Sequence, residues 1–219
     1  MRLLIISNMA HYIDGSKIVG WGPTVQEINH LAALFDEVAH IGCLHEGSAP
    51  ESSLPYDADN ISLIPLPPAG GNTIKEKLDI FKLTPTYLRA ILKALKDADV
   101  VHLRCPANIP MLALIVLVFR KNPKLRWVKY AGNWNSYPGQ ALSYKFQRWI
   151  LDNNFHRGVV TINGHWPDQP NHVYSFLNPS FTEDEYFKEK EMAAEKKLSF
   201  PVNLLFVGNF NKAKGVDQV

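Results

Sequence analysis

The chain has 219 residues, of which 46% are hydrophobic and 20% are charged. This balance is typical of soluble globular domains and excludes disordered, collagen-like and low-complexity proteins. The 23 lysines and arginines nearly match the 21 aspartates and glutamates, whereas a nucleic-acid-binding domain usually concentrates basic residues on one face. We therefore expect no nucleic-acid partner.

Two apolar segments are too short to act as a signal peptide or as a membrane-spanning helix. The run at 2–8 is too short for the core of a signal peptide. The longest apolar stretch, at 109–119, is interrupted by Pro110 and falls well short of the roughly 20 residues that span a bilayer. We expect a cytoplasmic protein, and we keep the inner face of the membrane open as an alternative location.

Apolar, β-type runs alternate with segments of helical spacing along the chain. In chain order, they predict a strand at 2–8, a loop at 9–22, a helix from Pro23 to about 37, a strand at 38–43, a loop at 44–59 and a strand at 61–66. A loop from Gly70, a helix from Thr84 to about 97, a strand at 99–104 and a helix at 109–120 follow. A strand at 125–131, a helix at 142–151 and strands at 159–162 and 172–177 complete the series. This alternation predicts an α/β fold with a doubly wound, Rossmann-like parallel sheet.

The two cysteines and the scattered histidines show no metal-ligand spacing, so we expect no metal site. Cys43 and Cys105 lie at the ends of predicted strands. In a sheet of order 3-2-1-4-5 these strands flank the first strand, which places the cysteines roughly 9–10 Å apart. That distance exceeds the reach of a disulfide.

Two further patterns lie towards the end of the sequence. The charged stretch 182–197 predicts a solvent-exposed linker helix. The apolar run 203–208 predicts a new strand, so we divide the chain into an α/β domain at 1–200 and the opening strand and turn of a second domain at 201–219. We expect the 219 residues alone to lack donor binding and turnover.

Several short motifs occur in a fixed order along these elements. They are Gly20-Trp21-Gly22-Pro23-Thr24, Asp99-Val100-Val101-His102, Phe176-Leu177-Asn178-Pro179, and Leu204-Leu205-Phe206-Val207-Gly208 followed by Lys214-Gly215. In this order they resemble the N-terminal half of a GT-B glycosyltransferase of the family 4 type, together with the start of its C-terminal domain. The resemblance extends over essentially the whole chain.

This resemblance implies an enzyme that moves a sugar from a nucleotide-sugar donor to a saccharide or lipid-linked acceptor. It implies retention of configuration, no cofactor, no obligatory metal, and a setting in cell-envelope or exopolysaccharide synthesis. Helix N-termini and cationic side chains would stabilise the leaving diphosphate. Two alternatives stay open: a non-catalytic sugar- or nucleotide-binding module, and a GT-B nucleotide-sugar epimerase.

Gly20, Gly22 and Thr24 form the first candidate binding segment. Glycines after the first strand allow close backbone approach and a positive φ. Free N–H groups at the start of the helix from Pro23 favour an anion such as a diphosphate. The alternative is that the glycines only form a turn, but the resemblance favours a site near the reacting sugar and its phosphates.

Arg104 is the second candidate, because ligands of doubly wound sheets bind where the strands end. Its guanidinium suits a phosphate or carboxylate, and the alternative is a surface salt bridge. His102 lies two residues earlier on the same face. A lone histidine inside a strand fits a buried core position better than a catalytic one.

The loop after the strand at 125–131 is rich in aromatic and amide side chains. Asn133 and Trp134 are the candidates there for contacts with an acceptor saccharide, since rings stack on sugars and amides bond to hydroxyls. The alternative is a packed loop. Members of the resembled family often carry a histidine near this position, and Asn133 cannot replace it as a base at neutral pH.

The resemblance assigns three more residues. Asn178 stands where the family has an Asn-Gly pair and is a candidate substrate contact. Asn209 and Lys214 match the Arg and Lys that clamp the donor diphosphate, and because asparagine lacks the charge, we expect weaker donor binding.

A weak peripheral membrane contact through the basic helix at 86–97 is a further candidate. Its lysines and arginines are few, so a solvated helix is the simpler interpretation.

Overall fold

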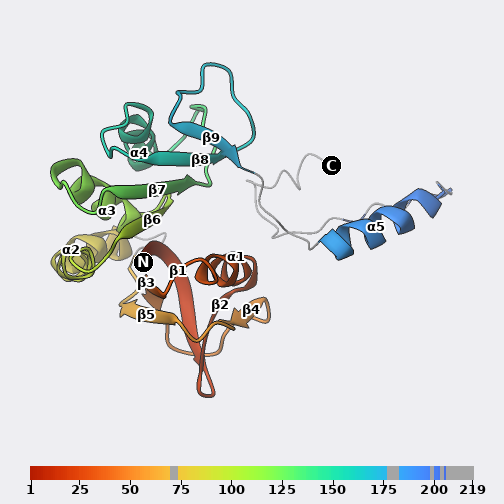
Figure 1. Cartoon of the computed structure of the whole chain (residues 1–219), viewed down its shortest axis with the longest axis horizontal. Helices are drawn as coiled ribbons and strands as arrows, with labels where there is room; N and C mark the ends of the chain where they lie inside the picture. Colours follow the sequence, from red (N-terminus) through yellow and green to blue (C-terminus); the bar gives the residue numbers. More distant parts are fainter. Residues whose placement is uncertain (70–73, 177–182, 198–199, 203–204, 206–219) are drawn as a thin grey trace. The chain divides into compact units, whose positions relative to one another are not determined.

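The structure is a computed structural model, and it describes residues 1–69, 74–176, 183–197, 200–202 and 205. The chain divides into two compact units, Met1–Asn178 and Pro179–Val219. The first unit has an α/β fold built on a mostly parallel sheet of nine strands (Figure 1). This confirms the predicted fold class, and the arrangement is compatible with a Rossmann-like fold.

Seven strands run parallel in the order β5-β3-β1-β6-β7-β8-β9. They are β1 (Arg2–Asp14), β3 (Glu37–Leu44), β5 (Ile61–Leu66), β6 (Val100–Cys105), β7 (Leu125–Tyr130), β8 (Val159–Asn163) and β9 (Val173–Phe176). The order of the first five strands is the predicted 3-2-1-4-5. Cys43 and Cys105 lie in the strands on either side of β1, and both are free and buried.

Helices pack on both faces of the sheet because side chains alternate along β1. Leu3 and Ile5 face α1 (Gly22–Ala32), which buries Ile28 against them. Leu4 and Ile6 point the other way, into the larger core. That core is covered by α2 (Ile74–Ala94), α3 (Asn108–Phe119) and α4 (Leu142–Asp152).

The segment predicted as a loop at 9–22 is a β-hairpin, so that prediction was wrong. β1 continues to Asp14 and turns through Gly15, whose φ is +58°, into the antiparallel β2 (Lys17–Trp21). The short β4 (Ser53–Pro55), in the other predicted loop, pairs with β2. An Asp-Gly pair between apolar alternating residues is itself a hairpin signal, which the polar composition of the segment obscured.

The predicted start of a helix at Thr84 was also wrong, because α2 already begins at Ile74 and contains Pro85. A proline inside a helix supplies no amide to the hydrogen-bond ladder. In the same turn the Thr84 hydroxyl donates to the Ile80 carbonyl at 2.8 Å. Burial of Tyr87 and Ile91 anchors the following turns against the sheet.

In the second unit, the structure confirms the predicted charged helix as α5 (Glu183–Glu195). All of its side chains are exposed, as expected for a solvated helix. Most of the predicted strand at 203–208 lies outside the described residues, and the division near residue 200 stays a prediction. Among the helices that the structure describes, none has the length and apolar character needed to cross a membrane.

Candidate functional site

A cavity of about 440 Å³ opens where the parallel strands end. Its walls come from residues 7–10 of β1, just beyond the pairing of β1 with β6, from the ends of β6 (104–107) and β7 (129 and 131–132), from the start of α1 and from Tyr144 of α4. The strand order reverses between β1 and β6, because one neighbour of β1 is β3 and the other is β6. Such a switch point is where doubly wound sheets bind ligands, and we call this space the switch-point cavity.

One carboxylate at this edge is shared by two cations. Glu27 Oε2 on α1 lies 2.8 Å from Lys129 Nζ and 3.1 Å from Arg104 Nη2. The Lys129 side chain is 5% exposed, and the other two are 13% and 16% exposed. Arg104 Nη2 also donates to Thr24 Oγ1 at 3.3 Å. The trio thus carries one surplus positive charge, and both cations line the switch-point cavity.

The trio does not saturate its own hydrogen-bonding capacity. Glu27 Oε1 and Arg104 Nη1 are buried and have no hydrogen-bond partner among the described residues. Buried polar atoms are nearly always paired, and an exception calls for an explanation. A polar ligand would offer hydrogen-bond partners to these two atoms if its binding shifted the Arg104 guanidinium slightly.

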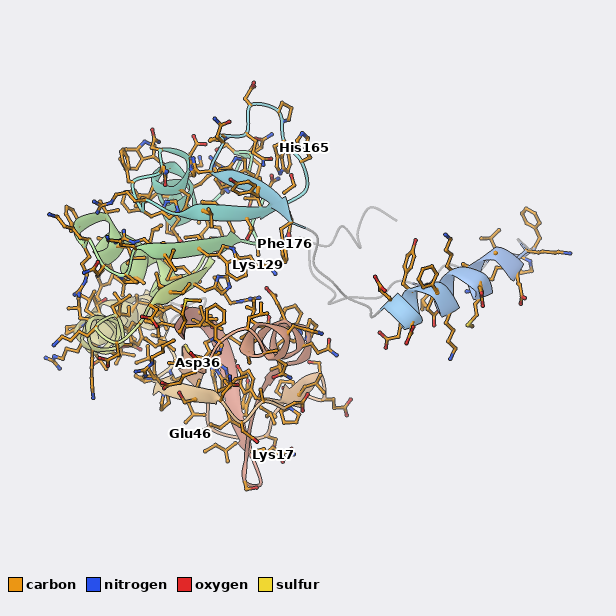
Figure 2. All side chains as sticks on the ribbon, viewed as in Figure 1. Lys17, Asp36, Glu46, Lys129, His165 and Phe176 are labelled. Atoms are coloured by element: carbon orange, nitrogen blue, oxygen red, sulfur yellow. The ribbon has the colours of Figure 1, made fainter. Side chains whose placement is uncertain are left out.

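The aromatic ring of Phe176 covers the ammonium of Lys129. Nζ lies 4.7 Å from the ring centroid, and Figure 2 shows the two side chains together at the end of β7 and β9. A cation over a ring face is attracted by the ring quadrupole. Phe176 therefore helps to hold Lys129 at the cavity although it is not one of its lining residues.

The protonation states of the trio follow from competition between burial and pairing. Burial raises the pKa of Glu27, but hydrogen bonds and charge from Arg104 and Lys129 outweigh it, so the pKa lies below its usual value. For Lys129, burial lowers the pKa more than Glu27 raises it. Glu27 is ionised at neutral pH and is held by two cations, so it is a counter-ion and not a base.

A chain of buried polar groups supports the cavity wall from behind. Ser7 Oγ is 2.8 Å from His40 Nε2, the Tyr56 hydroxyl is 2.8 Å from both His40 Nδ1 and His11 Nε2, and His11 Nδ1 is 3.1 Å from the Met9 carbonyl. The carbonyl can only accept, so His11 Nδ1 carries a proton. For neutral rings this sets every link: Tyr56 donates to His11, His40 donates to Tyr56, and Ser7 donates to His40.

Burial keeps both rings of this chain neutral. It lowers the pKa of His11 to about 4 and that of His40 well below its usual value. Ser7 and Met9, at the two ends of the chain, line the cavity. The histidines therefore position the wall of the cavity and do not enter it.

For Gly20 and Gly22 the structure shows close packing, and their role in substrate binding stays a prediction. Neither has a positive φ, and neither lines the cavity. A Cβ on Gly20 would collide with the end of the Met9 side chain, and one on Gly22 would lie 2.9 Å from the Ser52 carbonyl. That carbonyl also accepts the Gly22 N–H at 2.9 Å. The absence of a side chain at both positions is therefore required by close packing of the surrounding chain.

Side chains also occupy the start of α3, which reaches the cavity at Ala107. Asn8 Oδ1 accepts the Ile109 N–H at 2.8 Å, and Gln147 Oε1 accepts the Ala107 N–H at 3.1 Å. These bonds tie the middle of β1 and the middle of α4 to the start of α3. They satisfy groups that a helix N-terminus leaves unpaired.

The loop after β7 is a packed loop around Trp134. The indole is 7% exposed and meets the Tyr130 ring edge-on, with centroids 5.6 Å apart. Asn133 is exposed, and its Oδ1 accepts the Asn135 N–H at 3.0 Å. Neither lines the switch-point cavity, and Trp134 belongs to the hydrophobic core. Contacts of these two residues with an acceptor stay predictions.

Of the predicted substrate contacts, the structure brings Thr24 and Arg104 together at the cavity. Asn178, Asn209 and Lys214 lie outside the described residues. His102 is fully buried and stacks on Trp127 with centroids 3.8 Å apart, which confirms its assignment to the core.

Sequence reasoning missed Glu27 and Lys129. The available signal was Lys129 itself, a charged residue near the end of a mostly buried strand. Such a residue needs a partner of opposite charge.

Beyond the geometry, comparison with known proteins adds no assignment: none of the family models matches the chain, and no curated protein matches it. Within the described part of the chain, no three His, Cys, Asp or Glu side chains are grouped so as to hold a metal ion. The fold and cavity thus define an α/β protein with a cationic, partly polar site at the switch point of its sheet.

Proposed function

We propose that the chain is the acceptor-side domain of a glycosyltransferase of the GT-B type. The switch-point cavity would hold the saccharide acceptor, and a nucleotide-sugar would supply the transferred sugar. In the reaction, an acceptor hydroxyl forms a bond to the anomeric carbon while the bond from that carbon to the diphosphate breaks. The hydroxyl proton leaves with the nucleoside diphosphate or solvent.

The observation that carries this proposal is the placement of Arg104, Lys129 and Thr24 around one cavity at the switch point. All three side chains can donate hydrogen bonds, and two are cationic. Hydroxyl-rich and anionic groups of a glycosyl acceptor are acceptors for such donors. The α/β fold and the order of the sequence motifs support the same class.

The chemistry asked of these residues is orientation and electrostatic stabilisation. Arg104 and Lys129 are held by Glu27 before any ligand arrives, so little reorganisation is needed when charge develops on the departing diphosphate. Asn209 and Lys214 are proposed as further contacts with the nucleotide-sugar. Asn209 keeps a hydrogen-bond donor, and Lys214 keeps a positive charge.

A second candidate, a non-catalytic sugar-binding module, is favoured by one specific observation. Among the described residues that line the cavity, none is a carboxylate or a histidine. The Cys105 thiol lines it, but burial raises its pKa well above its usual range. In the described part of the chain, the cavity is therefore lined by no carboxylate or histidine that could act as acid or base near neutral pH, and a binding module does not need one.

A transfer assay separates the candidates. The protein is expressed from its complete reading frame and incubated with nucleotide-sugars and saccharide acceptors, and release of nucleoside diphosphate is followed. We expect release that depends on the acceptor and that falls roughly 10- to 100-fold in kcat/KM in Arg104→Ala, while Arg89→Ala, an exposed arginine on α2, is unchanged.

The other outcomes are distinct. Saccharide binding by nuclear magnetic resonance without any release would replace the transferase by the binding module. Conversion of a nucleotide-sugar to its epimer without acceptor would replace it by an epimerase.

A further inference from the structure

The outer surface of α3 and α4 exposes large apolar side chains around a groove of about 330 Å³. Only apolar side chains line this groove: Ile115, Val118, Phe119, Phe146, Trp149, Ile150 and Phe155. We call them the aromatic patch. Phe119 is 82% exposed and Trp149 is 53% exposed, and stacked and edge-on contacts join Phe146, Trp149 and Phe155. Contiguous exposed apolar surface of this kind marks an interaction site.

The sequence of α3 makes the exposure unusual. The helix Asn108–Phe119 contains no charged residue, although a helix on the outside of a sheet normally has a polar outer face. Ile115 and Val118 are only partly buried and face the groove. Ile115 and Val118 also pack against the core, but the core does not account for Phe119, which is 82% exposed.

The two chain segments that carry the aromatic patch are rich in cations. The segments 108–126 and 142–158 contain Arg120, Lys121, Lys124, Arg126, Lys145, Arg148 and Arg157, against the single acid Asp152. None of these seven forms a salt bridge with a described residue. Lys121, Lys124 and Arg157 line one shallow pocket together with the buried Arg126. We call the three exposed residues, Lys121, Lys124 and Arg157, the basic cluster.

Hydrogen bonds hold the basic cluster beside the patch. Arg157, two residues after Phe155, donates to the carbonyls of Val118 and Arg120 at 2.8 and 2.9 Å. These carbonyls flank Phe119 at the end of α3. The arrangement thus fixes positive charge directly beside the most exposed ring.

We propose that the aromatic patch and the basic cluster together dock this domain onto an anionic lipid membrane. Aromatic rings settle at the level of the lipid headgroups, and nearby lysines and arginines are attracted to anionic headgroups. A second copy of the chain fits this surface less well. Symmetric pairing would bring the two sets of cations towards each other, and like charges facing across an interface oppose association.

This inference does not depend on glycosyl transfer, and it differs from the contact that the sequence predicts. That contact used the basic helix at 86–97, which lies in α2 and the residues after it. The docking surface proposed here uses α3, α4 and the segments that follow them.

The test is sedimentation of the 219-residue chain with vesicles of phosphatidylcholine, with and without phosphatidylglycerol. We expect binding only with the anionic lipid and weaker binding at high salt. Lys121→Glu combined with Lys124→Glu should lower the partition coefficient by roughly tenfold or more. Phe119→Ser combined with Phe155→Ser should lower it by about tenfold.

Matched controls lie on α2. Phe81 is 76% exposed, and Lys93 and Lys96 are exposed, so Phe81→Ser and Lys93→Glu with Lys96→Glu remove similar side chains elsewhere. We expect these to change binding by less than about twofold. Equal losses in the α2 variants, or binding to phosphatidylcholine alone, would overturn the proposal.

A second measurement does not depend on the charge or serine variants. Lipids brominated in the acyl chain should quench Trp149 fluorescence in anionic vesicles, and Trp149→Phe should remove that quenching while Trp21→Phe keeps it. A dimer in solution that is disrupted by Phe119→Ser, without vesicle binding, would replace the membrane by a second copy and refute the proposal.

Discussion

The two ends of β7 each carry a buried cation, and the two cations are used differently. At the start of the strand, the guanidinium of Arg126 donates to the carbonyls of Pro123, Leu117, His156 and Arg120 at 2.7 to 2.8 Å. Near its end, Lys129 pairs with the carboxylate of Glu27 and lines the switch-point cavity. Both residues are about as buried, at 5% and 4% exposure.

The partners of Arg126 and Lys129 distinguish a structural cation from a cation that is available to a ligand. Arg126 meets only main-chain carbonyls, several of them at the C-terminal end of α3, where positive charge is favoured. All of its nitrogens are used within the protein. Lys129 and Arg104 share a single oxygen of Glu27, and some of their surroundings are open cavity. Burial alone does not separate the two cases; the identity of the partners does.

Substitution of Arg126, the structural cation at the start of β7, should reduce stability more than any other change considered below. Arg126→Met should destabilise the fold by about 4 kcal/mol, because four carbonyls lose a charged donor in a buried place. Urea unfolding followed by circular dichroism measures this. Lys124→Met, an exposed residue nearby, is the control and should change stability by less than about 0.5 kcal/mol. A loss for Arg126→Met no larger than the control's would mean that the carbonyls find other donors.

Acid should reduce the stability of the folded protein through one histidine near each end of β7. Burial lowers the pKa of His11, behind the cavity, to about 4, and burial likewise lowers the pKa of His156, next to Arg126, to about 4. In the unfolded chain each binds a proton near pH 6.5, so the stability they contribute is complete above 6.5 and is lost as the pH falls towards 4. Linkage gives about 3 kcal/mol for each.

The corresponding measurement is the free energy of unfolding between pH 7 and pH 4. His11→Gln and His156→Gln should each reduce its pH dependence by a similar amount, because burial is the leading cause at both ends. If one variant leaves the slope unchanged, that histidine is protonated in the folded protein.

A smaller stability effect is expected from the shared carboxylate. Glu27→Gln removes the counter-ion of two cations, and we expect a loss of about 2 kcal/mol at pH 7, reduced from the cost at a fully buried pair because the trio is partly exposed. Since the pKa of Glu27 is lowered in the fold, its contribution is present above the unfolded value and lost as the pH falls below it. The variant should therefore differ least from wild type in acid, and a difference that grows in acid would contradict the assignment.

Most elements of the fold could be predicted from the sequence. The strand and helix periods placed nearly every element of the parallel sheet, because a buried strand and an amphipathic helix leave local patterns. Two elements were not predicted. The polar composition of the segment at 9–22 suggested a loop where β2 forms, and Pro85 suggested a helix start where α2 already continues, because tertiary packing outweighed both local signals.

In the site, Arg104 and Thr24 could be predicted from their positions at a strand end and in the first turn of a helix. Glu27 and Lys129 could not be paired, because 102 residues separate them in the sequence. Aromatic residues in loops suit sugars, and for this reason the sequence predicts a sugar contact for Trp134. Its place among the buried core residues follows from three-dimensional packing, which no local pattern reports. Local patterns report elements, and only the folded chain reports which distant side chains meet.

The smallest stability effect and the sharpest functional one are expected from Lys129→Met. The substitution removes one cation but leaves Glu27 paired with Arg104 at 3.1 Å, so the trio becomes a balanced pair and stability should change by about 1 kcal/mol or less. Binding of a saccharide phosphate, measured by calorimetry, should weaken roughly tenfold or more because the cavity loses its surplus charge. Lys145→Met, an exposed lysine on α4, is the matched control for charge. A large loss of stability with unchanged binding would place Lys129 with Arg126 among the structural cations, and the distinction between the two ends of β7 would fail.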